Sequence, residues 1–342
     1  MGREELKVPK VSVLIPTFNY ARYLPEAIES VLEQDLRDFE LLISDDCSSD
    51  NSAEVIARYA AKDHRIRVQI HPQNLGMVRN WNWCLSEARG PYAKFLFGDD
   101  RLASRSALSQ LVGLLESNPS AIIASSPRFL IDENSNVIKV RNHLEKPGLH
   151  QGTKVIEQCL MRNGNLVGEP SIVLFRTHEA RRGFSEEYHQ LVDVEMWFHL
   201  LERGDLVYAA EPLGCFRRHQ RQQTELNRSQ LVGIREGAEL ALHYRSKPYL
   251  GKWAVCNILG SQLYAIRKSR RKTGAGTDAR LLQMELELTE HLGQAFWMFW
   301  VRRRTIRPVE NLLLWLRGAR HLGMSQFAIA GASPCQPKEK RP

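Results

Sequence analysis

The sequence predicts an α/β fold, in which a mixed but mainly parallel sheet carries helices on both faces, followed by a helical C-terminal region. Over the first half of the chain, short apolar runs alternate with amphipathic stretches, which is typical of parallel strands joined by right-handed helical crossovers. After about residue 216, almost every apolar pattern has helical spacing. The length of 342 residues, with 43% hydrophobic and 25% charged residues, suits about two globular domains.

Four strand–helix pairs are expected in the first third of the chain. Each strand is a short run rich in Val, Ile, Leu or Phe, and each helix has its apolar residues on one face. The expected strands span residues 11–15, 39–43, 66–70 and 92–97, and the expected helices span residues 24–32, 50–61, 77–88 and 107–115. Ligands of such sheets bind at the carboxyl ends of the strands, so functional residues are expected in the loops that follow them.

The rest of the chain is divided by a change of pattern near residue 216. Strands are expected at residues 121–124 and 171–175, and helices at residues 153–159, 194–201, 230–244, 253–270, 279–301 and 309–322. We therefore predict an α/β domain at residues 1–219, a helical region at 220–330 and a disordered tail at 331–342.

Composition excludes several classes of protein. No apolar run approaches the roughly 20 residues of a membrane-spanning helix, and the opening residues MGREELKVPK lack the apolar centre of a signal peptide. Six cysteines are scattered without a C-x-x-C pair, which indicates reduced thiols rather than a disulfide framework or a zinc site. We therefore expect a cytoplasmic protein.

Positive charge is concentrated toward the C-terminus. Residues 216–342 hold 23 Lys and Arg against 9 Asp and Glu, a net charge of +14. Two segments there, AFWMFWVRRR and LLLWLRGAR, combine bulky aromatic side chains with Arg. They suit a helix lying on an anionic membrane, here the inner face of the cell membrane, or a helix that packs on the protein or on a second subunit of a homo-oligomer. No nucleic-acid-binding module is present, so no nucleic-acid partner is expected.

Two acidic pairs follow two of the expected strands. Asp45 and Asp46 end the segment FELLISDD, and Asp99 and Asp100 end the segment AKFLFGDD. Carboxylates held close together repel each other unless a cation neutralises them. Oxygen ligands of this kind suit Mg²⁺ or Mn²⁺, the usual companions of phosphate groups.

The loop after the first expected strand has the sequence PTFNY. Such a turn can offer backbone N–H groups, a polar side chain and a ring to a nucleotide. No G-x-G-x-x-G follows this strand, and the chain lacks the P-loop, H-E-x-x-H and G-x-S-x-G motifs. A dinucleotide-binding enzyme, a kinase, a zinc protease and a serine hydrolase are therefore disfavoured.

Five segments occur in an informative order: VSVLIPTFNYARYLPEAIESVLEQ, FELLISDDCSSDNS, NLGMVRNWNWCLSEARGPYAKFLFGDDRL, DVEMWFHLLERG and PLGCFRRH. Together they resemble the family 2 glycosyltransferases, which are inverting sugar-nucleotide enzymes of GT-A fold. The resemblance covers roughly residues 10–220. Each segment alone is a weak signal, whereas five in order at consistent spacing are specific.

The resemblance implies a nucleotide site at the carboxyl edge of the sheet. Phe18 would stack on the base, Asp46 would accept an N–H of the base, and Asp99 would contact the ribose. Arg79 would lie near the base or the diphosphate. The nucleotide-binding residues implied in this way are Pro16, Thr17, Phe18, Asn19, Asp46, Arg79 and Asp99.

The resemblance also implies the reacting groups. Asp193 would be the general base, Asp100 the direct ligand of Mg²⁺ or Mn²⁺, and His219 a further metal or diphosphate ligand. Arg217 would bind the phosphates, and Glu169 would contact the acceptor. Taken without the resemblance, Asp193 could simply cap the helix that follows it.

Three positions depart from the family pattern. Phe97 stands where the family often has Asp, and Val192 stands where a Glu often precedes the base. Cys47 replaces the usual small Gly after the first acidic pair, and we expect its side chain to be buried.

We therefore expect an inverting glycosyltransferase that moves a sugar from a nucleotide-diphosphate sugar to an acceptor hydroxyl. UDP is the favoured nucleotide, with GDP and dTDP open. The acceptor is expected to be a glycan or a lipid-linked glycan in polysaccharide, lipopolysaccharide or other glycan biosynthesis. The alternative is a non-catalytic protein of the same fold that binds nucleotide sugars or glycans, and a nucleotidyltransferase is a weaker third because the Gly-rich loop is missing.

Overall fold

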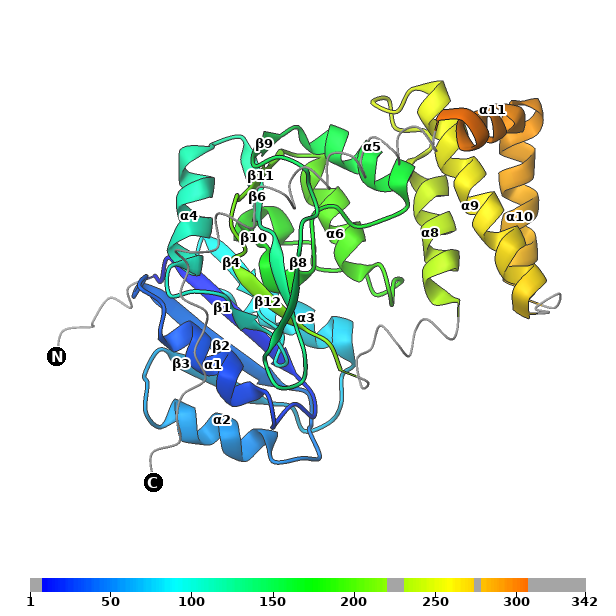
Figure 1. The fold of residues 1–342 in the computed structure, drawn as a ribbon. Helices are drawn as coiled ribbons and strands as arrows, with labels where there is room; N and C mark the ends of the chain where they lie inside the picture. The colour runs from blue at the N-terminus through cyan, green and yellow to red at the C-terminus, as the bar shows by residue number, and fades with distance from the viewer. Residues whose placement is uncertain (1–7, 220–230, 274–277, 307–342) are drawn as a thin grey trace.

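An eight-stranded sheet forms the centre of the protein (Figure 1). The computed structural model describes residues 8–219, 231–273 and 278–306. Neighbouring strands from β3 to β4 run parallel, while β10 is antiparallel to both of its neighbours and β9 is antiparallel to β11. In sheet order the strands are β3 (Ile66–Ile70), β2 (Phe39–Asp45), β1 (Val11–Thr17), β4 (Tyr92–Phe95), β10 (Leu174–Arg176), β6 (Ala121–Ser125), β11 (Asp205–Tyr208) and β9 (Gly148–His150).

Helices cover both faces of this sheet, as the sequence predicts (Figure 1). The expected α/β class with a mainly parallel sheet is therefore confirmed. One face packs against α1 (Leu24–Leu32), α2 (Ser52–Ala60) and α4 (Ala107–Ser117), and the other packs against α3 (Met77–Ser86), α5 (Gly152–Arg162) and α6 (Val192–Leu201).

Strand β1 shows how the sequence builds both layers. All seven of its residues are buried. Val13 and Ile15 belong to the apolar core that contains α1, whereas Leu14 belongs to the core that contains α3. A strand with two buried faces needs a near-continuous apolar run, which is why VSVLI identifies the strand without an alternation of polar residues.

A second, four-stranded sheet is not among the expected elements. Its strands, in order, are β5 (Arg101–Leu102), β12 (Gly214–Arg217), β7 (Arg128–Ile131) and β8 (Val137–Arg141). β5 has only two residues, which are too few to form a pattern, and every residue of β8 is exposed although its sequence VIKVR is rich in β-branched residues. This small sheet brings the segment after Asp100 beside the segment that leads to His219.

The described chain after residue 231 is helical, as expected. Its helices share one apolar core with α5 and α6, so Ile258 and Leu259 lie in the same cluster as Trp197. Within the described ranges, no helix combines the length and the apolar character needed to cross a bilayer. The domain boundary at residue 219 stays a prediction. The helices are α8 (Val232–Tyr244), α9 (Lys252–Thr273), α10 (Ala279–Leu292) and α11 (Phe296–Val301).

Two expected elements need correction. The helix expected at residues 279–301 is interrupted at Gly293, which ends α10. Its φ is +45°, a backbone conformation that most other residues would adopt only with strain. The strand expected at 171–175 starts three residues late, because Pro170–Ile172 forms a 3₁₀ turn before it. The helix expected at 309–322 and the tail at 331–342 lie outside the described residues.

Candidate active site at the carboxyl edge of the sheet

The carboxyl ends of β1, β2 and β4 bring the two acidic pairs to one edge of the sheet. The backbone N–H of Asp46 donates to the carbonyl of Thr17 (2.9 Å), which joins the ends of β2 and β1. After β4, a Cβ added to Gly98 would lie 2.9 Å from Oγ1 of Thr17, so this turn packs closely against the first loop. The side chains of Asp46, Asp99 and Asp100 are buried there.

The loop after β1 exposes one aromatic ring at this edge. Pro16 and Thr17 form the buried end of the strand, whereas Phe18 is 45% exposed. Asn19 adopts a left-handed φ of +59°, and its Oδ1 accepts the N–H of Ser49 (2.8 Å). Asn tolerates this conformation better than most residues, so Asn19 shapes the loop while Phe18 presents its ring.

Asp46 anchors the loop that enters α3. Its Oδ1 accepts the N–H of Leu75 (2.6 Å) and its Oδ2 accepts the N–H of Gly76 (3.0 Å). Arg79 lies in the first turn of α3, where its exposed side chain pairs with Glu186 (Nε–Oε2 2.8 Å). In this structure Arg79 therefore faces solvent beside the loop rather than the buried acids.

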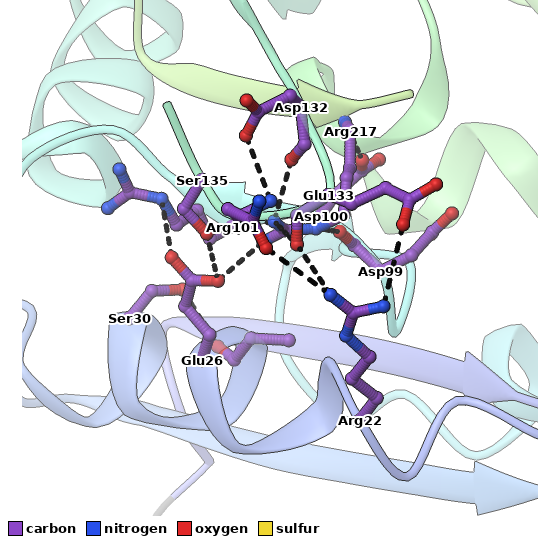
Figure 2. Close-up of polar contacts among 12 residues, drawn as sticks. Arg22, Glu26, Ser30, Asp99, Asp100, Arg101, Asp132, Glu133, Ser135 and Arg217 are labelled. Atoms are coloured by element: carbon purple, nitrogen blue, oxygen red, sulfur yellow. Dashed lines mark hydrogen bonds and ion pairs between the residues drawn. The ribbon is translucent and has the colours of Figure 1, made fainter. Parts of the chain in front are cut away.

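Asp99 and Asp100 are held in place by residues at and just after the end of β12 (Figure 2). The backbone N–H of Arg217 donates to Oδ1 of Asp100 (2.8 Å), and Nε of Arg217 donates to the carbonyl of Asp99 (2.7 Å). Nε2 of His219 lies 2.9 Å from Oδ2 of Asp99. The His219 ring also packs against the ring of Tyr23, with centroids 5.3 Å apart.

Arg217 contacts Asp99, Asp100 and other protein groups, whereas the family resemblance implies a role at the phosphates. The side chain is only 1% exposed, and its Nη1 donates to the carbonyl of Asp132 (3.0 Å) and to Oγ of Ser135 (2.8 Å). Its Nη2 pairs with Glu26 of α1 (Figure 2). The guanidinium is thus committed to protein groups.

The environment of Asp100 fits a metal ion. Burial, and then the neighbouring charge of Asp99, raise the pKa of Asp100 to about 8. The Oδ2 atom of Asp100 is buried without a hydrogen-bond partner, and so is the Oγ1 atom of Thr17. Among the residues that the structure describes, no three His, Cys, Asp or Glu side chains form a complete metal site. Mg²⁺ commonly takes one or two carboxylates together with substrate phosphates, so this partial site fits a metal completed by a diphosphate.

Asp193 lies in the first turn of α6 as a partly buried carboxylate. The helix begins at Val192 after an N-cap at Leu191, so Asp193 is not the capping residue. Its Oδ2 accepts from Nδ2 of Asn165 (3.0 Å), a neighbour that no sequence pattern indicates. Burial raises the pKa of Asp193 to about 6, against the opposing effects of its hydrogen bonds and of nearby Arg128. Such a carboxylate is a stronger base than an ordinary one and still ionised at neutral pH.

Arg128 connects Asp193 with the acidic pair, and sequence reasoning missed it. The side chain is buried in β7, pairs with Glu169, and its charge acts on both Asp100 and Asp193. Arg128 thus pairs directly with Glu169 and interacts electrostatically with both Asp100 and Asp193. The stretch SSPRFLI reads as an ordinary strand start, because the function of Arg128 depends on partners distant in the chain.

The three departures from the family pattern have structural explanations. Phe97 stacks on Trp81 with ring centroids 4.8 Å apart, so an aromatic pair occupies the place of a carboxylate. Val192 is buried in the core. The expectation that Cys47 is buried is wrong: its side chain is exposed, and its left-handed φ of +61° explains why Gly is usual at this position.

A solved structure shares the fold over most of the chain. Residues 1–349 of S. aureus TarS, in complex with UDP-GlcNAc, match with a TM-score of 0.55 at 17% identity, over 84% of this chain and 92% of that chain. At this identity the match shows the fold alone. The protein therefore has the GT-A fold, to which the C-terminal helical region is added.

Sequence comparison identifies the family. The model for glycosyl transferase family 2 matches residues 12–177. Protein MT1568 of Mycobacterium tuberculosis is 33% identical over 220 residues, which are 62% of this chain and 67% of the relative. A Campylobacter jejuni enzyme named GalNAc(5)-diNAcBac-PP-undecaprenol beta-1,3-glucosyltransferase is 30% identical over 195 residues, 56% of this chain and 60% of that enzyme. The chain belongs to glycosyltransferase family 2 and is a glycosyltransferase.

Proposed function

We propose that this glycosyltransferase moves a sugar, with inversion at the anomeric carbon, from a nucleotide-diphosphate sugar to an acceptor hydroxyl. The observation that supports the proposal is the buried Arg128, which pairs with Glu169 and whose charge acts on both the base candidate Asp193 and the metal candidate Asp100. A base and a leaving-group site on opposite sides of one reacting carbon are what in-line displacement requires.

The donor nucleotide would bind at the ends of β1, β2 and β4. The exposed ring of Phe18 suits stacking on the base, and Asp46 has carboxylate lone pairs beyond its two backbone bonds for an N–H of the base. Asp99 would contact the ribose, with Arg79 able to turn from Glu186 toward the diphosphate. UDP is favoured because TarS binds UDP-GlcNAc, and GDP and dTDP are the competitors to test.

Asp100 would hold a Mg²⁺ or Mn²⁺ ion through its unpartnered Oδ2, and His219 would complete the diphosphate site from the side of Asp99. When bound, such an ion stabilises the negative charge of the departing diphosphate. Arg217 keeps both acidic residues in place by holding a backbone carbonyl and a carboxylate oxygen.

Asp193 would take the proton of the acceptor hydroxyl as that oxygen attacks the anomeric carbon and the bond to the diphosphate breaks. Asn165 orients the carboxylate, and Arg128 stabilises its ionised form. General-base assistance of this kind contributes about 10²–10⁴-fold to the rate. Glu169, fixed by Arg128, would contact the acceptor beside the base.

The acceptor would be a glycan or a lipid-linked glycan at the inner face of the cell membrane. The C. jejuni relative is named for an undecaprenol-linked acceptor. On α11, Trp297 is 63% and Val301 45% exposed, and the side chain of Arg304 is exposed nearby. Phe299 on the same helix is buried against α9, so one side of α11 packs on the protein while the other suits an anionic membrane surface.

The test is Asp193→Asn, assayed with a panel of nucleotide sugars and Mn²⁺. Turnover should fall by about 10²–10⁴-fold, since only the base is lost. Binding of the nucleotide sugar should be unchanged, and a chelator should abolish turnover of the unaltered enzyme. Near-normal turnover of the variant would remove Asp193 from the mechanism.

A further inference from the structure

Glu236 is a buried carboxylate from the C-terminal region that reaches the polypeptide just before the base. It lies in α8, is 2% exposed, and its Oε1 accepts the backbone N–H of His189 (2.7 Å). Its Oε2 accepts the N–H groups of Gln190 (2.9 Å) and Leu191 (2.8 Å). One carboxylate therefore fixes three consecutive peptide groups.

These peptide groups form the entry to α6. Leu191 is the N-cap of the helix and offers no side-chain hydrogen bond to it, and Asp193 is the second helical residue. The first N–H groups of a helix lack partners within it, and a negative charge at that end is favourable. Glu236 adds to the negative charge that Asp193 and Glu195 place in the first turn, and it does so from a distant part of the chain by binding the N–H groups that precede the helix.

The same helical region also holds the second support of the base. Nε2 of Gln262 in α9 donates to Oδ1 of Asn163 (2.9 Å), at the left-handed end of α5. Two residues later, Asn165 donates to the Asp193 carboxylate. The backbone before Asp193 and the loop that orients its side chain are thus both tied to α8 and α9.

We propose that Glu236 is a positioning residue for the general base, acting through the backbone of residues 189–191 to set where the Asp193 carboxylate lies. The inference rests on the proposed role of Asp193. This role gives the C-terminal region a part in catalysis, although the match to the family model ends at residue 177.

The nature of the contact predicts a graded response to substitution. A Gln side chain keeps the shape of Glu236 but turns an NH₂ group toward backbone donors, so at least one of the three bonds is lost. Asp keeps both oxygens but is one methylene shorter. A displacement of about 1 Å of a reacting group can cost about 10²-fold in rate.

The experiment compares Glu236→Gln with Glu239→Gln, a change on the same helix at a glutamate that pairs at the surface with Arg280. Glu236→Gln should lower kcat by about 10- to 100-fold, with the KM for donor and the affinity for the nucleotide sugar within about twofold of normal. Glu239→Gln should retain normal kcat. An unchanged kcat in Glu236→Gln, or an equal loss in affinity for the nucleotide, would overturn the proposal.

A second arm separates positioning of the base from general support of the fold. In an Asp193→Asn background, adding Glu236→Gln should change the residual turnover by less than about twofold, because the group being positioned is gone. A full further loss would overturn the proposal. If Glu236→Gln does not fold, the same measurements on Glu236→Asp decide, and normal kcat there counts against it. Normal turnover of Asp193→Asn alone would instead refute the proposed function.

Discussion

At the edge of the sheet, burial and hydrogen bonding give two residues of the same type different chemical properties. Asp100 and Asp193 are both carboxylates with raised pKa values, but one has an unpartnered oxygen and the other is oriented by Asn165. In the proposed mechanism, this difference separates a metal ligand from a base. The sequence predicts both residues by position and by the family resemblance, whereas Arg128, whose charge acts on both, becomes evident only when distant strands are brought together.

The pKa of Asp193 predicts an acid limit for activity. Because burial raises this pKa to about 6, the base is ionised above that pH and protonated below it. At saturating Mn²⁺, kcat/KM should fall by about tenfold per pH unit below about pH 6. Asn165→Ala should move the midpoint upward, since the Asn165 hydrogen bond lowers the pKa of Asp193. A midpoint near pH 4 would contradict the assignment.

Cys47 offers a stability test that is independent of activity. Its φ of +61° is strained for a side chain with a Cβ, at a cost of roughly 1–2 kcal/mol, whereas Gly adopts it freely. Cys47→Gly also makes the unfolded chain more flexible, which costs about 0.4–1 kcal/mol. We expect a net gain of about 0.5 kcal/mol in the free energy of unfolding, measured by denaturant titration. A loss of stability would show that the exposed thiol contributes more than its backbone costs.

At the scale of elements, the parallel layer was predictable and the second sheet was not. The helix expected at residues 24–32 has the bounds of α1, because its buried face leaves a strong apolar pattern. The strand expected at 66–70 has the bounds of β3, in which apolar and polar residues alternate although only Ile66 is buried. β8 is exposed throughout and β5 is very short. The contacts of Arg217 on β12 were not predictable, because its partner Glu26 lies on a helix at the other end of the domain's sequence.

The Arg217 network predicts how strongly the two sheets are joined. Arg217→Met would leave the buried Asp99 carbonyl without its donor, while Glu26 would keep Arg101 and Ser135 as partners, and the change should cost about 1–3 kcal/mol of unfolding free energy. Weaker nucleotide and metal binding should accompany the loss. Arg22→Met is the matched control, because the exposed Arg22 guanidinium makes a long ion pair of 3.5 Å with Glu133 (Figure 2). This substitution should cost less than about 0.5 kcal/mol of unfolding free energy. Equal effects of the two changes would contradict a special role for Arg217.

For the whole molecule, the GT-A fold and the helical addition both follow from the sequence, but the link between them does not. Periodicity identifies α8 as a helix, yet it gives no reason to single out Glu236 among the glutamates of that region. Its partners are backbone N–H groups, which carry no sequence signature. Contacts of this type become evident only in the folded chain.

Membrane association is a property of the whole surface and is tested on the intact protein. The protein should co-sediment with phosphatidylglycerol-containing vesicles at low salt and be released as salt screens the attraction. Trp297→Ala should weaken binding severalfold, because the exposed indole is lost from the contact. Val140→Ala removes an exposed apolar side chain from β8 instead and should have no effect. A protein that stays in the supernatant at low salt would refute the membrane surface.

The shared core has a practical consequence for anyone who wishes to shorten this enzyme. Phe198 of α6 meets Tyr244 of α8 edge to face, with ring centroids 5.2 Å apart. A truncated protein that lacks residues 231–306 would expose the Phe198 ring and the apolar face of α6, the helix that carries Asp193, to solvent. Truncated forms made for crystallisation or screening should therefore retain residues 231–306, or expect aggregation in place of a minimal catalyst.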